Sequence, residues 1–279
     1  MNNPLKAIIK RFIWRTRWLF NKSPWILTLP NGSKIETAKL GAGALIYYLG
    51  YSEPEIAYFV NYFLKPGMTF VDIGAHLGEY CILSSPLVEK SGKIFAFEPN
   101  PDIYPFLTRN IYRNSLINVV LDNHAVSSKE GEIIFQIHKE ASMSSLKFNT
   151  LQKVENIVRE IHVSTINLDN YFQNYEKEIN LIKVDVEGAE TEVIIGAKNL
   201  CSKSKGDAPT WIIEYNPGTA ISTGRDAKNI LYLLWEFKYY IYELKKGDVK
   251  SQFQPSLSFI TNPPNNFSTL VASKVNLYL

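Results

Sequence analysis

The chain has 279 residues, of which 46% are hydrophobic and 20% are charged, a composition that excludes a disordered chain and is typical of a globular protein with one main domain. Its 30 basic and 27 acidic side chains give a net charge of +3 and a pI near 8.6. Only two cysteines occur, Cys81 and Cys201, and they lie far apart. This spacing excludes a disulfide scaffold or a CxxC metal site and fits a reducing compartment. The four histidines form no zinc-binding pattern, so nothing in their spacing supports a metal site.

The charges are unevenly distributed along the chain. Residues 1–35 carry seven basic side chains and no acidic one, so the remainder holds 23 basic and 27 acidic side chains and is mildly acidic. The same segment has apolar residues at steps of three and four, which predict a helix with one apolar face. That face consists of Leu5, Ile8, Ile9, Phe12, Ile13, Leu19 and Phe20. Trp14 and Trp18 fall on the opposite side of the helix.

Two interpretations of this basic helix are open. In the first, it packs on the rest of the chain and exposes a basic face to solvent. In the second, it docks on an anionic membrane surface or on a partner protein, with the tryptophans at the interface. The segment does not have the pattern of a membrane span, because basic residues interrupt every apolar run, and it lacks the h-region of a secretory signal.

The next segment is predicted to form short strands and turns over residues 24–50. Ser52-Glu-Pro-Glu55 then has the pattern of a capping box with proline in the first turn, which predicts a helix from here to about Leu64. We therefore divide the chain into an N-terminal arm with a short β segment, residues 1–51, and a main domain, residues 52–279.

In the main domain, apolar strands alternate with helical stretches. The predicted strands are 69–73, 94–97, 119–121, 179–186, 211–215, 239–244 and 269–272, and the predicted helices begin at Glu79, Asp102, Glu190 and Asp226. This alternation predicts an α/β fold with a mostly parallel sheet, helices on both faces, and a ligand site at the carboxyl ends of the strands. The serine-rich interval 138–163 interrupts the alternation and is predicted to be a lid or substrate loop.

The first strand of this domain ends in a glycine turn with the pattern Asp72-x-Gly74-x-x-x-Gly78, instead of the GxGxxG of dinucleotide-binding proteins. A carboxylate before the turn would repel a pyrophosphate but attract an ammonium group. The second strand ends at Glu98, where a carboxylate can accept hydrogen bonds from two ribose hydroxyls. A ribose together with a cationic amino acid describes S-adenosylmethionine (SAM) better than it describes NAD.

Three more carboxylates follow two later strands of the predicted sheet. Asp185 and Glu187 come after one apolar run, and Glu214 ends the next. Because parallel strands end at one edge of a sheet, these side chains should converge near one crevice. A carboxylate that ends a buried strand needs a cation, a ligand or a hydroxyl as its partner.

Four motifs together resemble the FkbM-type SAM-dependent methyltransferases: VDIGAHLGEY at 71–80, FEPNP at 97–101, HAVS at 124–127 and IKVDVEGAE at 182–190. The resemblance covers roughly residues 52–273. It implies the Rossmann-like sheet of class I methyltransferases, with seven mostly parallel strands and the last hairpin reversed. It also implies O-methylation of a hydroxyl on a sugar, glycolipid or polyketide.

The resemblance assigns cofactor contacts to Asp72, Gly74, His76, Gly78, Glu98, Asn100 and His124. Asp72 would hold the methionine ammonium, directly or through water, and the glycines would give the backbone room. Glu98 would bind the ribose, with Asn100 and His124 beside the adenine. His76 stands where the family usually has Asn, and it would face the methionine end.

For catalysis, Asp185 and Glu187 would line the methyl-transfer crevice and Glu214 would face the acceptor. A general base among these three residues would accept the proton of the acceptor hydroxyl. A divalent ion held by Asp185 and Glu214 is a variant of the same idea.

Two other functions stay open at this point: an NAD-dependent oxidoreductase, and a non-catalytic adaptor of a glycan-assembly complex. Nucleic-acid methylation is disfavoured, because Asn262-Pro-Pro-Asn265 is in the wrong place for an amino-group methyltransferase and the main domain is acidic. The expected partner is a small-molecule or glycan acceptor, selected by residues 138–165 and 245–268. We expect a cytoplasmic protein that contacts the inner face of the membrane, or a glycosyltransferase, through residues 4–22.

Overall fold

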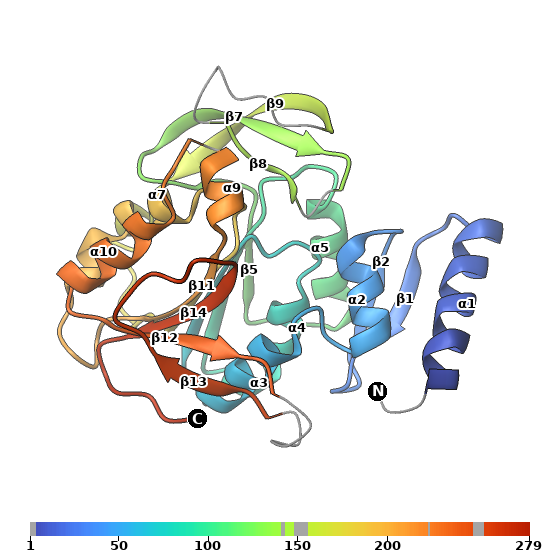
Figure 1. The fold of residues 1–279 in the computed structure, drawn as a ribbon, viewed down its shortest axis with the longest axis horizontal. Helices are drawn as coiled ribbons and strands as arrows, with labels where there is room; N and C mark the ends of the chain where they lie inside the picture. The colour runs from blue at the N-terminus through green and yellow to red at the C-terminus, as the bar shows by residue number, and fades with distance from the viewer. Residues whose placement is uncertain (1–3, 141–142, 148–155, 223, 248–253) are drawn as a thin grey trace.

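The computed structural model describes residues 4–140, 143–147, 156–222, 224–247 and 254–279. Its centre is an eight-stranded sheet with the order β13-β12-β14-β11-β10-β3-β4-β5 (Figure 1). The strands, in chain order, are β3 (Thr69–Ile73), β4 (Lys93–Phe97), β5 (Val119–Asp122), β10 (Leu181–Val184), β11 (Thr210–Tyr215), β12 (Tyr240–Lys245), β13 (Ser256–Phe259) and β14 (Ser268–Ser273).

Five neighbouring strands of this sheet, from β5 to β11, are parallel, and β14 is antiparallel to both β11 and β12. The predicted α/β class and the reversed hairpin are therefore confirmed. The predicted strand count of seven is wrong by one, because β13 pairs with β12 and adds an eighth strand at the edge of the sheet. The sequence of β13, Ser-Leu-Ser-Phe, is half polar and partly exposed, so it lacks the apolar run that marks the buried strands.

Helices cover both faces of the sheet. One face packs against α3 (Pro54–Phe63), α4 (Glu79–Val88) and α5 (Tyr104–Arg113), and the other against α6 (Leu168–Tyr171), α7 (Glu190–Ile195), α8 (Lys198–Ser202) and α10 (Lys228–Glu236). A short α9 (Pro217–Ser222) follows β11. Successive strand residues point to opposite faces of the sheet. Phe70 packs in the hydrophobic core under α3, α4 and α5, and Val71 packs in the core under α6, α7, α8 and α10. Both cores are thus built on a sheet that is buried on each side.

A second, four-stranded sheet stands above the ends of the central strands (Figure 1). Its strands, in the order β6-β9-β7-β8, are β6 (Ala125–Val126), β7 (Gly131–His138), β8 (Ser145–Leu146) and β9 (Ile157–Ile166). The prediction of a loop over 138–163 is therefore wrong for its described part, since β8 and most of β9 lie there; residues 141–142 and 148–155 of the interval fall outside the described chain. Most β9 side chains are at least partly exposed, so its sequence lacks a clear apolar signal.

The N-terminal arm contains α1 (Pro4–Phe20), the hairpin β1 (Trp25–Thr28) and β2 (Lys34–Thr37), and α2 (Gly41–Leu49). The prediction of strands and turns up to residue 50 missed α2. A glycine is needed at Gly43 because a Cβ there would lie 2.1 Å from the Thr37 hydroxyl oxygen, so one of the two glycines that suggested a turn serves close packing of α2 on β2. The predicted capping box is also wrong: the Ser52 hydroxyl donates to Glu79 at 2.6 Å, and α3 begins without a side-chain cap.

Helix α1 packs on the rest of the chain through its tryptophans. Trp14 and Trp18 are buried, and the Trp14 ring stacks on Trp25 and Tyr47 at centroid distances of 5.8 and 5.4 Å. The first interpretation of the arm is confirmed in that the helix packs, but its solvent side includes the apolar face as well as basic residues. The second interpretation placed the tryptophans at an external interface, and this is wrong because they are buried. None of the helices in the described ranges has the length and apolarity to cross a membrane.

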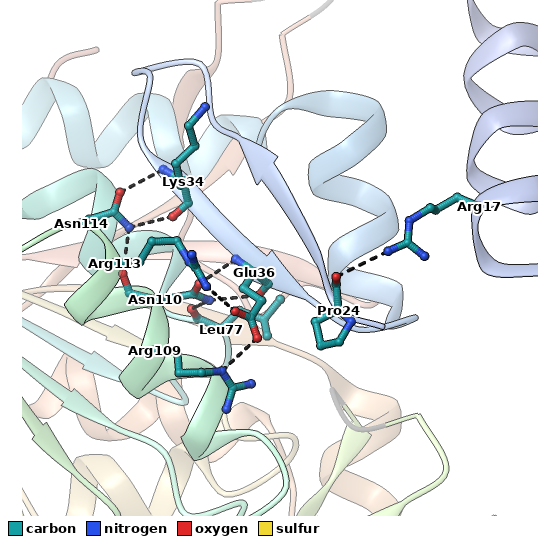
Figure 2. A network of polar contacts seen from close by, with 9 residues as sticks. All are labelled: Arg17, Pro24, Lys34, Glu36, Leu77, Arg109, Asn110, Arg113 and Asn114. Atoms are coloured by element: carbon teal, nitrogen blue, oxygen red, sulfur yellow. Dashed lines mark hydrogen bonds and ion pairs between the residues drawn. The ribbon is translucent and has the colours of Figure 1, made fainter. Parts of the chain in front are cut away.

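Polar contacts fasten β2 to α5 (Figure 2). The Glu36 carboxylate accepts hydrogen bonds from Arg109 and Arg113, while the Asn110 side chain accepts from the Glu36 amide and donates to its carbonyl. Asn114 makes the same pair of contacts with the backbone of Lys34. The arm is therefore tied to the main domain by a network whose centre, Glu36 and Asn110, is buried.

Candidate active site

A cavity of about 1130 Å³ opens at the carboxyl ends of the central strands. Its walls come from α2, from the turns after β3 and β4, from the ends of β10 and β11, and from the second sheet. Eight of the ten predicted site residues line it: Gly74, His76, Glu98, Asn100, His124, Asp185, Glu187 and Glu214. Asp72 and Gly78 are not among the lining residues.

Gly74 brings the ends of three strands together. Its φ is +79°, and a Cβ at this position would lie 1.9 Å from the backbone oxygen of Asp185. The amides of Gly74 and Ala75 both donate to the carbonyl of Phe97, at the end of β4. A side chain at residue 74 would therefore separate the turn after β3 from the carboxylate-bearing end of β10.

Gly78 and Asp72, the two predicted residues that do not line the cavity, lie next to it in the packed interior. Gly78 starts α4 with φ +81°, and a Cβ there would lie 2.6 Å from a Leu107 methyl group, so this glycine lets α4 approach α5. Asp72 is fully buried, which raises its pKa, and its Oδ2 accepts from the Cys81 thiol at 3.3 Å. Its other oxygen has no hydrogen-bond partner among the described residues.

Glu98 lies at the end of β4 with both oxygens oriented by the backbone. It accepts from the amide of His76 at 2.9 Å and from that of Asn100 at 2.8 Å, and burial raises its pKa to about 7. His76 adopts φ +48°, and its Nε2 is buried without a hydrogen-bond partner in the described chain. Burial lowers its pKa to about 4, so the imidazole is neutral at pH 7.

Asn100 and His124 lie on the side of the cavity that faces the second sheet. Asn100 is buried, and its amide donates to the Ser144 hydroxyl at 3.4 Å. The His124 side chain is 40% exposed, and its Nδ1 lies 2.6 Å from a carboxylate oxygen of Asp122. Both side chains thus face a space bounded by β4, β5 and the second sheet.

Asp185, Glu187 and Glu214 form the cluster that their sequence positions predicted: one carboxylate oxygen from each lies within 4.8 Å of the others. Burial raises the pKa of Glu187 to about 8, and it raises that of Glu214 well above the usual range, assisted by the charge of Asp185. Burial also opposes ionisation of Asp185, but Lys183 and a hydrogen bond from Glu214 outweigh it and lower the pKa. At neutral pH the cluster therefore has Asp185 ionised beside a protonated Glu214.

Lys183 is a site residue that sequence reasoning did not assign. It is 2% exposed, its Nζ lies 3.0 Å from Asp185 Oδ2, and it sits 5.0 Å from the centre of the Tyr80 ring. Burial disfavours its charge, but Asp185 and Asp72 raise its pKa above the usual value. A lysine inside an apolar strand, two residues before the strand-end Asp185, was the signal that could have found it.

Glu53 is the second missed residue, and it comes from the loop before α3. It lines the cavity, burial and the charge of Asp185 raise its pKa to about 7, and its carboxylate lies 3.3 Å from the Tyr80 hydroxyl. No strand pattern leads to residue 53, so only the packing of α3 on α4 places it.

The two segments predicted to select the acceptor also reach this cavity. Ser144 and Leu146 line the cavity from the first segment, 138–165. Lys246, Gly247 and Phe267 line it from the second, 245–268. Phe267 is 52% exposed, which leaves an aromatic surface at the cavity.

The chain is similar in sequence to known methyltransferases. A family model described as "Methyltransferase FkbM domain" matches residues 72–241, more than half of the chain. Hexuronic acid methyltransferase AglP from Haloferax volcanii is 31% identical over 169 residues, which are 60% of this chain; the match spans about three-fifths (61%) of that relative.

Among solved structures, a SAM-dependent O-methyltransferase from Thermotoga maritima aligns with a TM-score of 0.43 at 15% identity, covering 94% of this chain and 82% of that one. An O-methyltransferase from Bacillus cereus in complex with SAH aligns with a TM-score of 0.44 at 12% identity, covering 79% and 80%.

Proposed function

Because the chain belongs to the FkbM methyltransferase family, we propose that it is a SAM-dependent O-methyltransferase that methylates a hydroxyl of a sugar or glycan. The observation that carries the proposal is the half-buried cluster of Asp185, Glu187 and Glu214, which lines the large cavity at the strand ends. The similarity to a hexuronic acid methyltransferase supports a sugar acceptor.

The residues around the cavity fit SAM, which carries a sulfonium, an ammonium, a ribose and an adenine. Glu98 presents a carboxylate held in place by two amides, suited to ribose hydroxyls. The free oxygen of Asp72 suits a contact with the ammonium through water, since Asp72 does not line the cavity. A neutral His76 puts no positive charge beside a cationic ligand.

SAM supplies an electrophilic methyl group on its sulfonium, so the protein mainly has to align the acceptor oxygen and exclude water. We assign the proton transfer to Asp185, the carboxylate that Lys183 keeps ionised. It accepts the hydroxyl proton as the C–O bond forms and the C–S bond breaks. Its lowered pKa makes it a weak base, which suffices because the proton becomes acidic as the bond forms. Glu214, protonated, donates a hydrogen bond to Asp185 and helps to keep it ionised.

Replacing Asp185 with Asn should lower turnover by about 10²–10⁴-fold while SAM affinity, measured by calorimetry, changes little. The assay is transfer of labelled methyl from SAM to hexuronic acid glycosides, with the exposed Asp207→Asn as the matched control. Turnover of Asp185→Asn within a few-fold of wild type would refute the assigned base. Failure of the wild type to bind SAM would refute the function itself.

A divalent cation on Asp185 and Glu214 is the competing role for the cluster. Lys183 already supplies a positive charge 3.0 Å from Asp185, so we expect EDTA to leave turnover unchanged. Loss of activity on chelation, restored by Mg²⁺, would instead assign the cluster to metal-assisted activation of the hydroxyl.

The proposed location is the cytoplasm, at the inner face of the membrane.

The family match favours methyl transfer over the NAD-dependent alternative. The adaptor alternative predicts SAM binding without turnover on any glycan, so the same labelled-methyl assay separates it from the enzyme.

A further inference from the structure

The face of α1 that points away from the rest of the protein is apolar. Six large side chains on it are between 42% and 83% exposed: Ile8, Ile9, Phe12, Ile13, Leu19 and Phe20. With 3.6 residues per turn they fall along one side of the helix, where Thr16 is the polar residue between Ile13 and Leu19. Figure 1 shows α1 at the edge of the molecule, with β1 and α2 on its inner side. Most soluble proteins expose apolar side chains singly, so a stripe of six marks an interaction site.

The packing of α1 shows that this exposure is built into the fold. The helix is held from its other side by Trp14 and Trp18, and the Lys10 ammonium donates to the carbonyls of Tyr47 and Tyr48 at 3.1 and 3.2 Å. These contacts fix the rotation of the helix about its axis. The tryptophans face the protein and the aliphatic stripe faces outward.

The charged residues that border the stripe are all basic. By helical position, Arg11 and Arg15 lie along one border, and both are exposed. Lys10 and Arg17 lie along the other border, where both donate to backbone carbonyls of the protein, and α1 contains no acidic residue. An apolar face with cationic edges is the pattern of helices that lie in the surface of a bilayer.

We propose that α1 lies in the surface of an anionic phospholipid bilayer, with its apolar stripe in the acyl boundary, and holds the methyltransferase there. Charge decides between this occupant and a second copy of the chain. A two-fold dimer through the stripe would bring the basic borders of two α1 helices together, which is repulsive, whereas anionic headgroups neutralise them. The helix needs no rearrangement to dock, because the tryptophan face already binds the protein.

The test is sedimentation of the full chain with vesicles of phosphatidylcholine alone or with 30% phosphatidylglycerol added. We expect binding to the anionic vesicles to be at least about tenfold tighter than to the neutral ones and to weaken as salt is raised. The double variant Ile8→Glu/Phe12→Glu should weaken it by at least about tenfold, since each large apolar side chain contributes that much when buried. The matched control is Ile117→Glu, which charges an isoleucine that is 74% exposed elsewhere.

SAM calorimetry on each variant shows whether the fold is intact, since the buried face of α1 is unchanged. The proposal fails if the wild type does not bind anionic vesicles, if it binds neutral vesicles equally, or if the double variant binds like the wild type. It also fails if analytical ultracentrifugation shows a wild-type dimer that the double variant converts to monomer, because the stripe would then be a self-association surface.

Discussion

Lys183 controls the charge of the carboxylate cluster although it is itself almost fully buried. Its ammonium lies between Asp185 and the ring of Tyr80, and it is register partner to Asp72 on the neighbouring strand. Without it, three carboxylates and Glu53 would share one desolvated space, and burial would keep them protonated. One lysine therefore lets a single carboxylate of the cluster stay ionised at neutral pH.

Replacing Lys183 with Met should shift the pH dependence of turnover. Lys183 lowers the pKa of Asp185, so its removal raises that pKa. The base is then protonated up to a higher pH, the acidic limb of the kcat profile moves to higher pH, and turnover at pH 7 falls by at least about tenfold. The measurement is kcat between pH 5 and 9, at saturating SAM.

The control for this prediction is Lys246→Met, which removes a cavity lysine whose side chain is 76% exposed and paired with Glu55. Its acidic limb should coincide with that of the wild type. An unshifted limb in Lys183→Met would show that another group sets the profile.

For single residues, the sequence predicts a position at the cavity when the residue ends a buried strand. Asp185 and Glu214 converge because parallel strands end at one edge, and Glu98 lines the cavity for the same reason. Asp72 precedes the turn but is covered by it, so its exclusion from the cavity follows from side-chain packing that spacing does not encode. Glu53 depends on how one helix packs on another, for which the sequence has no local signal.

Among the elements, the segment between β13 and β14 offers the cavity an exposed aromatic ring, that of Phe267. Replacing it with Ala should raise the KM of a sugar acceptor by about three- to tenfold, the usual size of an aromatic contact, without changing SAM affinity. The readouts are steady-state kinetics and calorimetry. Phe259→Ala is the matched control, since this phenylalanine is 56% exposed but does not line the cavity. An equal effect of the two variants would contradict a role in acceptor binding.

The attachment of β2 to α5 depends on Glu36 (Figure 2). Its carboxylate is buried and accepts from two arginines. Glu36→Gln removes the charge that both guanidiniums face, so the free energy of unfolding should fall by about 1–3 kcal/mol. Urea denaturation measures it, with the exposed Glu178→Gln as control. A loss below about 0.5 kcal/mol would show that the asparagine contacts alone hold the hairpin.

Element prediction from the sequence succeeded for the strands buried on both faces and failed for β9 and β13, which are half-exposed. β3 and β10 have every residue buried, and each is an apolar run that is recognisable without context. β9 and β13 expose most or half of their residues, so their sequences resemble loops. α2 was missed because Gly43 serves close packing on Thr37, a tertiary contact.

At the scale of the whole molecule, several glutamates that line the cavity stay protonated at a pH where they would be ionised in the unfolded chain. Burial raises the pKa of Glu53, Glu79 and Glu98 to about 7 and of Glu187 to about 8, whereas an unfolded glutamate ionises near 4.5. The folded chain therefore binds more protons than the unfolded one, and this contribution to stability is lost as pH rises through 7 to 8. His76, with its lowered pKa, acts in the opposite direction, but only below about pH 6.5.

The thermal midpoint of the SAM-free protein should consequently fall by about 3 °C or more between pH 6.5 and 8.5. Saturating SAM should narrow this difference, because its positive charges favour the ionised carboxylates. Differential scanning fluorimetry at the two pH values measures both. Glu187→Gln should flatten the dependence, since Glu187 titrates within the window. A midpoint that rises with pH would contradict the assigned protonation states.

Helix α2 lies between the cavity and helix α1. Tyr48 lines the cavity and also contacts Trp14 of α1, so a single helix, about 10 Å across, separates the reaction chamber from the docking helix. A bilayer that holds α1 would confine the encounter with a lipid-borne glycan to two dimensions, where the acceptor's effective concentration far exceeds that of the same sugar free in solution. We expect the enzyme to be selective for what its acceptor is attached to, even where the cavity itself does not distinguish the two sugars.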